Sequence, residues 1–99
     1  MAVGVQIDVV SGTLAQYDEV VERMGYLPGG LPAPNVLFHW VTPIENGFRV
    51  VDVWESREAF DQFAREKMVP LFEEVGVRVP SEITYFEVHN YLSGGRWRR

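Results

Sequence analysis

The 99-residue chain contains no cysteine and only two histidines, His39 and His89. The absence of cysteine excludes disulfide bonds and thiolate metal sites, and two histidines are too few for the usual zinc site built from protein ligands alone. No apolar run approaches the roughly 20 residues that span a bilayer, and the first residues lack the basic-then-apolar pattern of a signal peptide. We therefore expect a cytoplasmic protein with no metal and no membrane partner.

Basic residues are also scarce, with nine against fourteen acidic residues and a formal net charge of −5. Three of the nine are Arg96, Arg98 and Arg99, which leaves an acidic body. Such a body repels phosphate backbones, so we do not expect a nucleic-acid partner. We interpret residues 1–95 as a single domain, in line with the chain length, and residues 96–99 as a flexible basic tail.

Apolar residues, by contrast, are plentiful: they make up 46% of the chain, and aromatic residues make up 13%. A chain of this length buries only about 60–65% of its unfolded surface. The surplus indicates apolar surface that faces a partner subunit or lines a cavity.

The spacing of the apolar residues predicts the first half of the fold. Alternation over residues 3–9 is typical of a strand. Helical spacing over residues 14–24 predicts a helix, with Thr13 and Gln16 as a capping box at its start and Gly25 at its end. Glycine and proline dominate residues 25–35, which predicts a loop, and we expect this loop to cap the mouth of a cavity.

The second half repeats the pattern with two strands before the helix. Residues 36–42 and 48–55 read as strands joined by Asn46-Gly47, a strong hairpin signal. A second helix begins after Ser56 and ends at Gly76, with a kink near Met68 caused by Pro70. A last strand covers residues 83–91. The chain is therefore predicted to be an α+β protein of the ferredoxin-like βαββαβ kind, with a four-stranded antiparallel sheet and two helices on one face.

The hairpin also predicts a register. A two-residue Asn46-Gly47 loop places His39 opposite Trp54 and Val41 opposite Asp52, whereas a three-residue loop with a bulge would place Phe38 and Trp40 beside Asp52 and Trp54. In the first register we expect Val51 and Val53 to face the helices, as do the β-branched residues of the first strand and Phe86 and Val88 of the last. The other face would then present Gln6, Asp8, Leu37, His39, Val41, Val50, Asp52, Trp54, Tyr85, Glu87, His89 and Tyr91. This mixture of aromatic and polar groups suits a ligand cavity roofed by a second subunit.

Three segments carry a family resemblance: Leu37-Phe38-His39, the run GFRVVDVWES over residues 47–56, and Glu58-Ala59-Phe60. Together they resemble the antibiotic biosynthesis monooxygenase-like family of the dimeric α+β barrel superfamily, over roughly residues 3–92. The resemblance implies a homodimer whose two sheets pack face to face, with one cavity per subunit. Some members oxidise phenolic polycyclic substrates with dioxygen and no cofactor, and others degrade haem.

The resemblance also bears on cofactors. Haem-degrading members have an asparagine in the first strand and an axial histidine about ten residues after the tryptophan that corresponds to Trp54. This chain has Gln6 and Asp8 in the first strand and no histidine in the second helix. We therefore expect no haem, and in the absence of the usual motifs no flavin or metal either.

Cofactor-free oxygenation requires a base that deprotonates a phenol or enol, a donor for the oxyanion, and a dry aromatic slot. His39 or His89 could be that base, Asp52 could orient a histidine or act as a base itself, and Trp54 could stack on a planar substrate. Further candidates for substrate contacts are Gln6, Asp8, Tyr85 and Glu87.

Structural readings of the same residues stay open. Either histidine could be held by a cross-strand partner, Trp54 could pack in the dimer seam, and Asp52 or Glu87 could pair with Arg49 or Arg78 across the dimer. We predict a small cofactor-independent monooxygenase-like enzyme, an oxidoreductase acting on an aromatic or polyketide-type molecule. The alternatives are a cyclase, isomerase or lyase that uses the same cavity without oxygen, or a non-catalytic dimeric binding protein.

Overall fold

The computed structural model describes residues 2–26, 35–78 and 82–92. The elements are β1 (Val3–Val10), α1 (Leu14–Met24), β2 (Val36–Ile44), β3 (Gly47–Trp54), α2 (Arg57–Phe63), a π-helical segment η1 (Ala64–Met68), α3 (Val69–Glu74) and β4 (Glu82–Glu87). This order confirms the predicted βαββαβ arrangement, although β4 is shorter than expected. The proposed cavity cap within residues 25–35 falls largely on residues 27–34, which lie outside the described residues, as does the basic tail.

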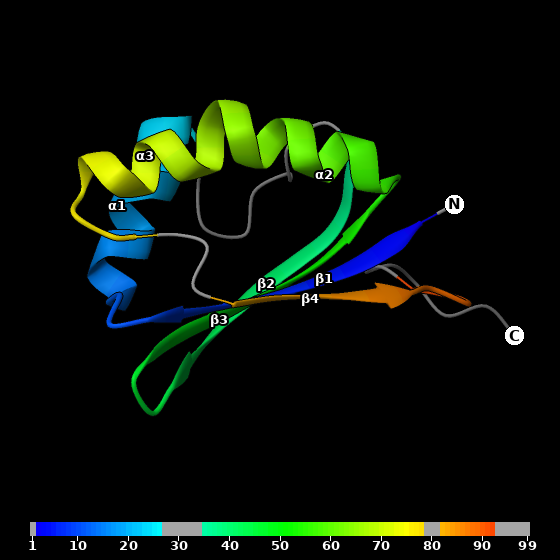
Figure 1. Cartoon of the computed structure of the whole chain (residues 1–99), viewed down its shortest axis with the longest axis horizontal. Helices are drawn as coiled ribbons and strands as arrows, with labels where there is room; N and C mark the ends of the chain where they lie inside the picture. The colour runs from blue at the N-terminus through cyan, green and yellow to red at the C-terminus, as the bar shows by residue number, and fades with distance from the viewer. Residues whose placement is uncertain (1, 27–34, 79–81, 93–99) are drawn as a thin grey trace, which may run out of the picture.

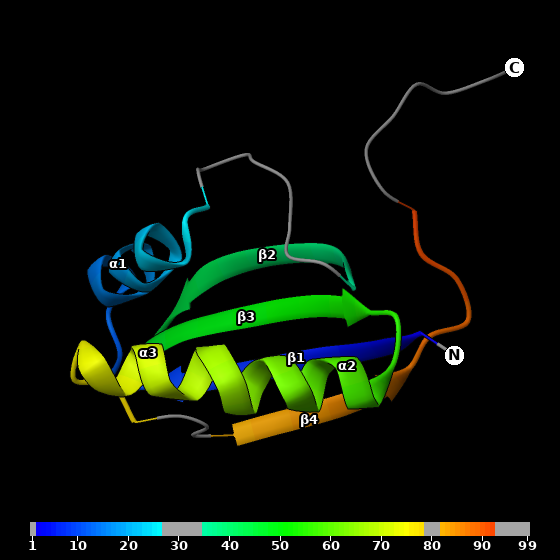
Figure 2. The ribbon, with the colours of Figure 1, turned by 90° about the horizontal axis from the view of Figure 1, so that it is seen from above.

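The four strands form one antiparallel sheet in the order β2-β3-β1-β4. The helices of the described residues lie on one face of this sheet, and none of the described elements covers the other, bare face (Figure 1). Seen from above, α1 lies on the β2 side and the continuous run from α2 to α3 lies over the β1–β4 side (Figure 2). No helix within the described ranges is both long enough and apolar enough to cross a membrane.

The helix ends follow the local signals in the sequence. The Thr13 hydroxyl accepts a bond from the Gln16 N–H (3.1 Å), and the Gln16 side chain accepts one from the Thr13 N–H (2.9 Å). Gly25 ends α1 with a φ of +86°, and the Ser56 hydroxyl accepts the Ala59 N–H at 3.1 Å at the start of α2. The predicted caps are therefore confirmed.

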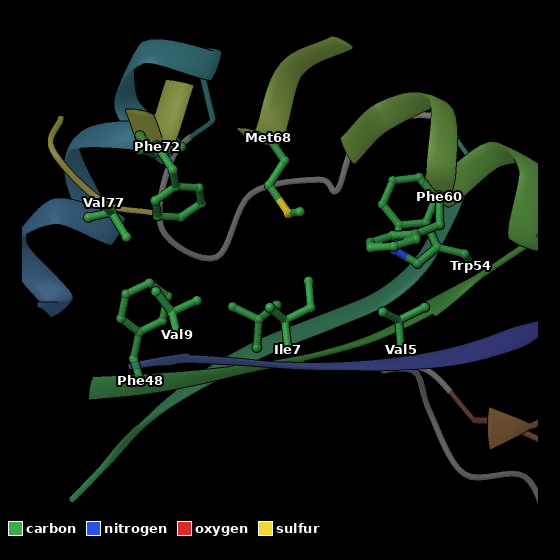
Figure 3. Packing of buried hydrophobic residues seen from close by; sticks show 11 residues of the cluster. Val5, Ile7, Val9, Phe48, Trp54, Phe60, Met68, Phe72 and Val77 are labelled. Carbon is green, nitrogen blue, oxygen red and sulfur yellow. The ribbon is translucent and has the colours of Figure 1, made fainter. Parts of the chain in front are cut away.

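The helical run does not break at Pro70 but changes its winding just before it. Pro70 has no N–H to offer the preceding turn, and residues Ala64–Met68 adopt a π-helix that passes directly into α3. The wider turn directs Met68, which is 7% exposed, toward the sheet. In Figure 3 the Met68 side chain lies between Phe72 on one side and Trp54 and Phe60 on the other. The expected kink near Met68 is thus a π segment.

The pairing of β2 with β3 is shifted by two residues from the register that the sequence predicts. Ile44 pairs with Gly47, so Glu45 and Asn46 form the turn, and both registers weighed from the sequence are wrong. The cause lies in β1: a Cβ on Gly47 would stand 1.9 Å from the Val9 carbonyl oxygen, so this glycine is needed inside the strand for close approach of the two backbones. His39 consequently opposes Asp52, not Trp54.

The assignment of sheet faces is also corrected. A shift of two residues keeps His39, Asp52 and Trp54 on a common face, but that face lies under the helices, where Trp54 is 2% and Asp52 5% exposed. In β4 the ring of Tyr85 packs edge-on against Phe60 of α2, which puts it on the covered face as well. The valines of β3 were expected in the core, yet burial of the larger Trp54 indole releases more free energy.

The bare face therefore has a different composition from the one predicted. Val51 and Val53 lie there, beside Phe38 and Trp40 of β2 and Phe86 of β4. The three aromatic residues are 40%, 46% and 50% exposed in that order. Val88 was expected under the helices with Phe86, but it also lies on the bare face, near Gly4 of β1.

The prediction for β1 is confirmed. Val5, Ile7 and Val9 are buried against the helices, whereas Gln6 and Asp8 alternate with them and lie on the bare face. Asp8 forms a two-pronged ion pair there with Arg49 of the neighbouring strand, at 2.7 and 3.0 Å.

Candidate functional site

A cavity of about 90 Å³ lies between the sheet and the helices. Its wall is almost wholly aliphatic and aromatic, with one polar corner where β2 and β3 meet α1. The lining residues are Tyr17, Val20, Val21, Met24, Tyr26, Val36, His39, Val50, Asp52, Trp54, Phe63, Met68 and Phe72. An apolar pocket with a few converging polar groups is the usual form of a small-molecule site.

The polar corner is a continuous chain of hydrogen bonds between four side chains. The Tyr17 hydroxyl lies 2.5 Å from His39 Nε2, and His39 Nδ1 lies 2.5 Å from Asp52 Oδ1. The Trp54 indole N–H donates to the other Asp52 oxygen, Oδ2, at 3.0 Å. These residues come from α1, β2 and β3, and His39 and Asp52 meet because they are cross-strand partners.

The donors and acceptors of this chain are determined by the chemistry of the groups. An indole N–H can only donate, and an aspartate carboxylate can only accept. His39 Nδ1 must therefore carry a hydrogen that it donates to Asp52, which leaves Nε2 of the neutral ring as an acceptor. The Tyr17 hydroxyl then donates to Nε2. This arrangement matches the way in which a carboxylate holds a catalytic histidine in one tautomer.

The surroundings of Tyr17 favour its protonated form. Burial, followed by the negative charges of Asp52 and Asp18, raises the pKa of Tyr17 to about 12. At neutral pH the phenol is therefore a neutral donor. Its ring also packs edge-on against Phe48, with centroids 5.6 Å apart, which anchors it over β3.

Trp54 is held from above by the helices. The centroid of its ring lies 5.7 Å from that of Phe60 and 5.0 Å from that of Phe63, and Figure 3 shows Trp54 pointing from the sheet toward Phe60. These two ring contacts hold the Trp54 indole where its N–H can donate to Asp52. Every buried side-chain nitrogen and oxygen in the described part of the chain has a partner.

The structure thus brings together three of the residues predicted from the sequence, His39, Asp52 and Trp54. It does not bring the others to the cavity. Gln6 and Asp8 lie on the opposite face of the sheet, and the Tyr85 ring lies under the Arg57 guanidinium, 3.7 Å from its centroid. Glu87 is exposed at the end of β4, as is His89 just beyond it.

The acidic residues Asp8 and Asp52 are paired within the chain. Arg49 pairs with Asp8, and Asp52 pairs with His39, which is the histidine contact considered for Asp52 from the sequence. The guanidinium of Arg49 holds the pKa of Asp8 below its usual range, mainly through their hydrogen bond. In the described residues, no three His, Asp or Glu side chains are grouped so that they could hold a metal ion.

Tyr17 is the functional candidate that sequence reasoning missed. It recurs at helical spacing with Val20, Val21 and Met24, a pattern that predicts only an apolar helix face. The available signal was its hydroxyl group, which a position on a buried face obliges to find a partner. That partner is 22 residues away in the chain.

The fold defines a class. An antiparallel four-stranded sheet with helices on one face is a ferredoxin-like α+β arrangement, and it matches the fold of solved structures of antibiotic biosynthesis monooxygenase-like proteins. The resemblance found in the sequence is thereby confirmed for the fold. No family model and no curated protein sequence matches the chain.

Three solved structures illustrate the likeness. SnoaB, a cofactor-independent oxygenase from Streptomyces nogalater, superposes with a TM-score of 0.58 at 17% identity, covering 94% of this chain and 97% of SnoaB. A Deinococcus radiodurans protein, provisionally assigned as an antibiotic biosynthesis monooxygenase, gives 0.56 at 12% identity, covering 97% and 100%.

A variant of MhuD, from Mycobacterium tuberculosis, with two manganese protoporphyrin IX molecules in each active site, gives 0.51 at 22% identity, covering 95% of this chain and 100% of MhuD. At these identities the three structures establish the fold alone.

Proposed function

We propose that this chain is a small cofactor-independent monooxygenase-like enzyme that acts on an aromatic or polyketide-type molecule carrying a phenol or enol. The observation that carries the proposal is the Tyr17–His39–Asp52 chain of hydrogen bonds, which ends in the wall of an apolar cavity. A histidine held by a buried carboxylate in this way can accept a proton from a substrate. The apolar wall excludes water from the anion that the base creates. SnoaB, with the same fold, is a cofactor-independent oxygenase.

The proposed reaction needs no reductant other than the substrate. The base removes a proton from the enol form of a ring ketone such as anthrone, and the electron-rich carbon of the anion bonds to dioxygen. The resulting hydroperoxide loses water, so that one oxygen atom becomes a new carbonyl and the other leaves in water. Anthrone, C14H10O, would thus combine with O2 to yield anthraquinone, C14H8O2, and H2O.

The size of the site bears on the substrate. The cavity of about 90 Å³ is smaller than the roughly 150 Å³ apolar cavity that binds benzene in an engineered protein. A neighbouring hollow of about 180 Å³ has Tyr26, Trp54 and Phe63 as common walls with it. The cavity would have to widen to take the reacting ring, and the rest of a molecule of more than one ring would extend into this hollow.

The bare face of the sheet supports the second part of the proposal, that the chain works as a homodimer. Three exposed aromatic side chains, Phe38, Trp40 and Phe86, lie there around Val51 and Val53. An apolar face of this kind is usually covered in the working molecule, and a second copy covers it symmetrically. Sedimentation at micromolar concentration should show a dimer; a stable monomer would contradict this part.

Oxygen consumption with anthrone tests the function. We expect uptake above the uncatalysed rate, with one O2 consumed for each anthraquinone formed. The variant His39→Asn keeps a donor for Asp52 but has no basic nitrogen, and it should lower turnover by about 10²–10⁴-fold while the protein remains folded. Turnover of an enolisable substrate without oxygen uptake would favour a cyclase, isomerase or lyase. Tight binding without turnover would favour a binding protein.

A further inference from the structure

The base of this site is not presented to the cavity directly. His39 Nε2, the only basic nitrogen of the neutral ring, already accepts a bond from the Tyr17 hydroxyl at 2.5 Å. The two rings are nearly parallel, 10° apart, with centroids 6.0 Å from each other. The phenol therefore approaches His39 edge to edge, along the direction of the nitrogen lone pair. A substrate in the cavity therefore meets a His39 whose acceptor nitrogen, Nε2, is already hydrogen-bonded to Tyr17.

We propose that Tyr17 is the catalytic residue that exchanges a proton with the substrate, and that His39 receives that proton through it. This proposal rests on the proposed function and assigns the substrate contact within it. Tyr17 lines the cavity, and its oxygen has a free lone pair when its hydrogen points to His39. A substrate hydroxyl can donate to that lone pair from the cavity side.

The transfer conserves atoms and charge in one concerted step. The substrate O–H bond breaks and its proton joins the Tyr17 oxygen, while the Tyr17 O–H bond breaks and its proton joins His39 Nε2. Tyr17 ends neutral, as it began, and its hydroxyl then donates to the substrate anion. His39 ends as an imidazolium whose Nδ1–H remains bonded to the carboxylate of Asp52.

Two features of the surroundings suit this relay. Tyr17 cannot act as a free anionic base, because its pKa of about 12 keeps the phenol protonated at neutral pH, so it can only pass a proton on. The receiving end is prepared for positive charge, since Asp52 is 5% exposed and is held in place by both His39 and the Trp54 indole. Trp54 in this scheme is a positioning residue for Asp52.

The relay predicts a specific substrate feature. The reacting group must be an acidic hydroxyl, such as a phenol or enol, located at the edge of a flat apolar molecule. The hydroxyl must reach the α1 side of the cavity, where Tyr17 lies, and not the β2 edge, where His39 is partly open to solvent with a side-chain exposure of 35%.

Binding of 4-nitrophenol tests the relay without oxygen. This single-ring phenol ionises near neutral pH, and its absorption distinguishes bound phenol from bound phenolate. We expect the wild-type protein to bind it as phenolate. Tyr17→Phe keeps the ring that packs on Phe48 but removes the hydroxyl, and it should lower the ratio of bound phenolate to phenol about tenfold or more, as loss of a hydrogen bond to a charged group predicts.

Two further variants complete the experiment. His39→Asn should abolish the ionisation, and Tyr85→Phe, which removes a phenol hydroxyl from a ring that lies against Arg57 and outside the cavity, should retain it. Circular dichroism melts verify that each variant is folded. Ionisation that persists in Tyr17→Phe but not in His39→Asn would overturn the relay and leave His39 as a direct base.

A wild-type protein that does not ionise the probe would also overturn the relay, whatever its oxygen uptake. Conversely, wild-type ionisation that Tyr17→Phe abolishes, in a protein that consumes no oxygen, would support the relay while refuting the oxygenase.

Discussion

Replacing Trp54 with phenylalanine tests whether the buried hydrogen-bond chain stabilises the fold. Phenylalanine keeps an aromatic ring between Phe60 and Phe63 but removes the indole N–H that donates to Asp52 Oδ2 at 3.0 Å. The carboxylate then loses a partner in a place where little water can replace it, because Asp52 is only 5% exposed.

The magnitude follows from two contributions. A hydrogen bond to a charged group contributes about 1.5–3 kcal/mol to the free energy of unfolding. The smaller ring buries less apolar surface, which costs about 1 kcal/mol. We expect Trp54→Phe to lower the free energy of unfolding by about 2.5–4 kcal/mol, and the melting temperature of a domain of this size by roughly 10 °C or more.

Urea denaturation followed by far-ultraviolet circular dichroism is the suitable assay, since the substitution alters tryptophan fluorescence itself. Trp40→Phe is the matched control: it removes the same atoms from a side chain that is 46% exposed and whose indole donates no hydrogen bond within the described part of the chain. The control loses apolar contact but no hydrogen bond, so it should lower the free energy of unfolding by no more than about 1 kcal/mol, with protein concentration held constant because Trp40 lies on the proposed dimer face. Equal effects of the two substitutions would refute a buried Trp54–Asp52 bond.

Three further outcomes are expected. The ion pair with Arg49 lowers the pKa of Asp8 in the folded state. The ion pair therefore stabilises the fold above the unfolded pKa of about 3.9, and this stabilisation is lost as pH falls through the lower folded pKa. The urea midpoints of wild type and Asp8→Asn should differ at pH 6 and converge toward pH 3. Gly47→Ala should prevent normal folding, because its Cβ would lie 1.9 Å from a carbonyl oxygen of β1. The control Gly25→Ala has no atom within 4 Å of its Cβ and should only incur backbone strain of about 1 kcal/mol. A thermal melt in which Gly25→Ala is the less stable of the two variants would contradict the observed register. Thr13→Ala removes the α1 cap and should lower the free energy of unfolding by about 0.5–2 kcal/mol, and a melting temperature equal to that of wild type would show that the capping box is not formed in solution.

Much of the fold was predictable because the signals are local. The capping box of Thr13 and Gln16, the glycine that ends α1 and the alternation of β1 each depend on residues a few positions apart. Their conformational preferences act before any tertiary contact forms. The antiparallel βαββαβ arrangement follows from the order of these elements, and the strand-to-helix step at Trp54 and Ser56 was enough to indicate the family fold.

The register of the hairpin could not be read in the same way. Asn46-Gly47 has the composition of a tight turn, but Gly47 lies in β3 because β1 approaches it too closely for any side chain. The Asn46 carbonyl accepts the Ser11 N–H at 2.6 Å, a contact with the end of that same distant strand. The position of Gly47 is therefore determined by a strand more than thirty residues away, and the turn lies one residue earlier in the chain than the sequence predicts.

The sequence by itself determined which elements form, their order, and that His39, Asp52 and Trp54 lie on a common face of the sheet. Only the tertiary structure decided that this face is the buried one and that Tyr17 completes the site. The reason is the free energy of burying polar groups, which is prohibitive for an unpartnered carboxylate and acceptable for one that accepts two hydrogen bonds. One of those partners, Trp54, is two residues away in β3, but the other, His39, comes from β2, so the side on which Asp52 can be buried is settled only when the strands pair and the layers pack.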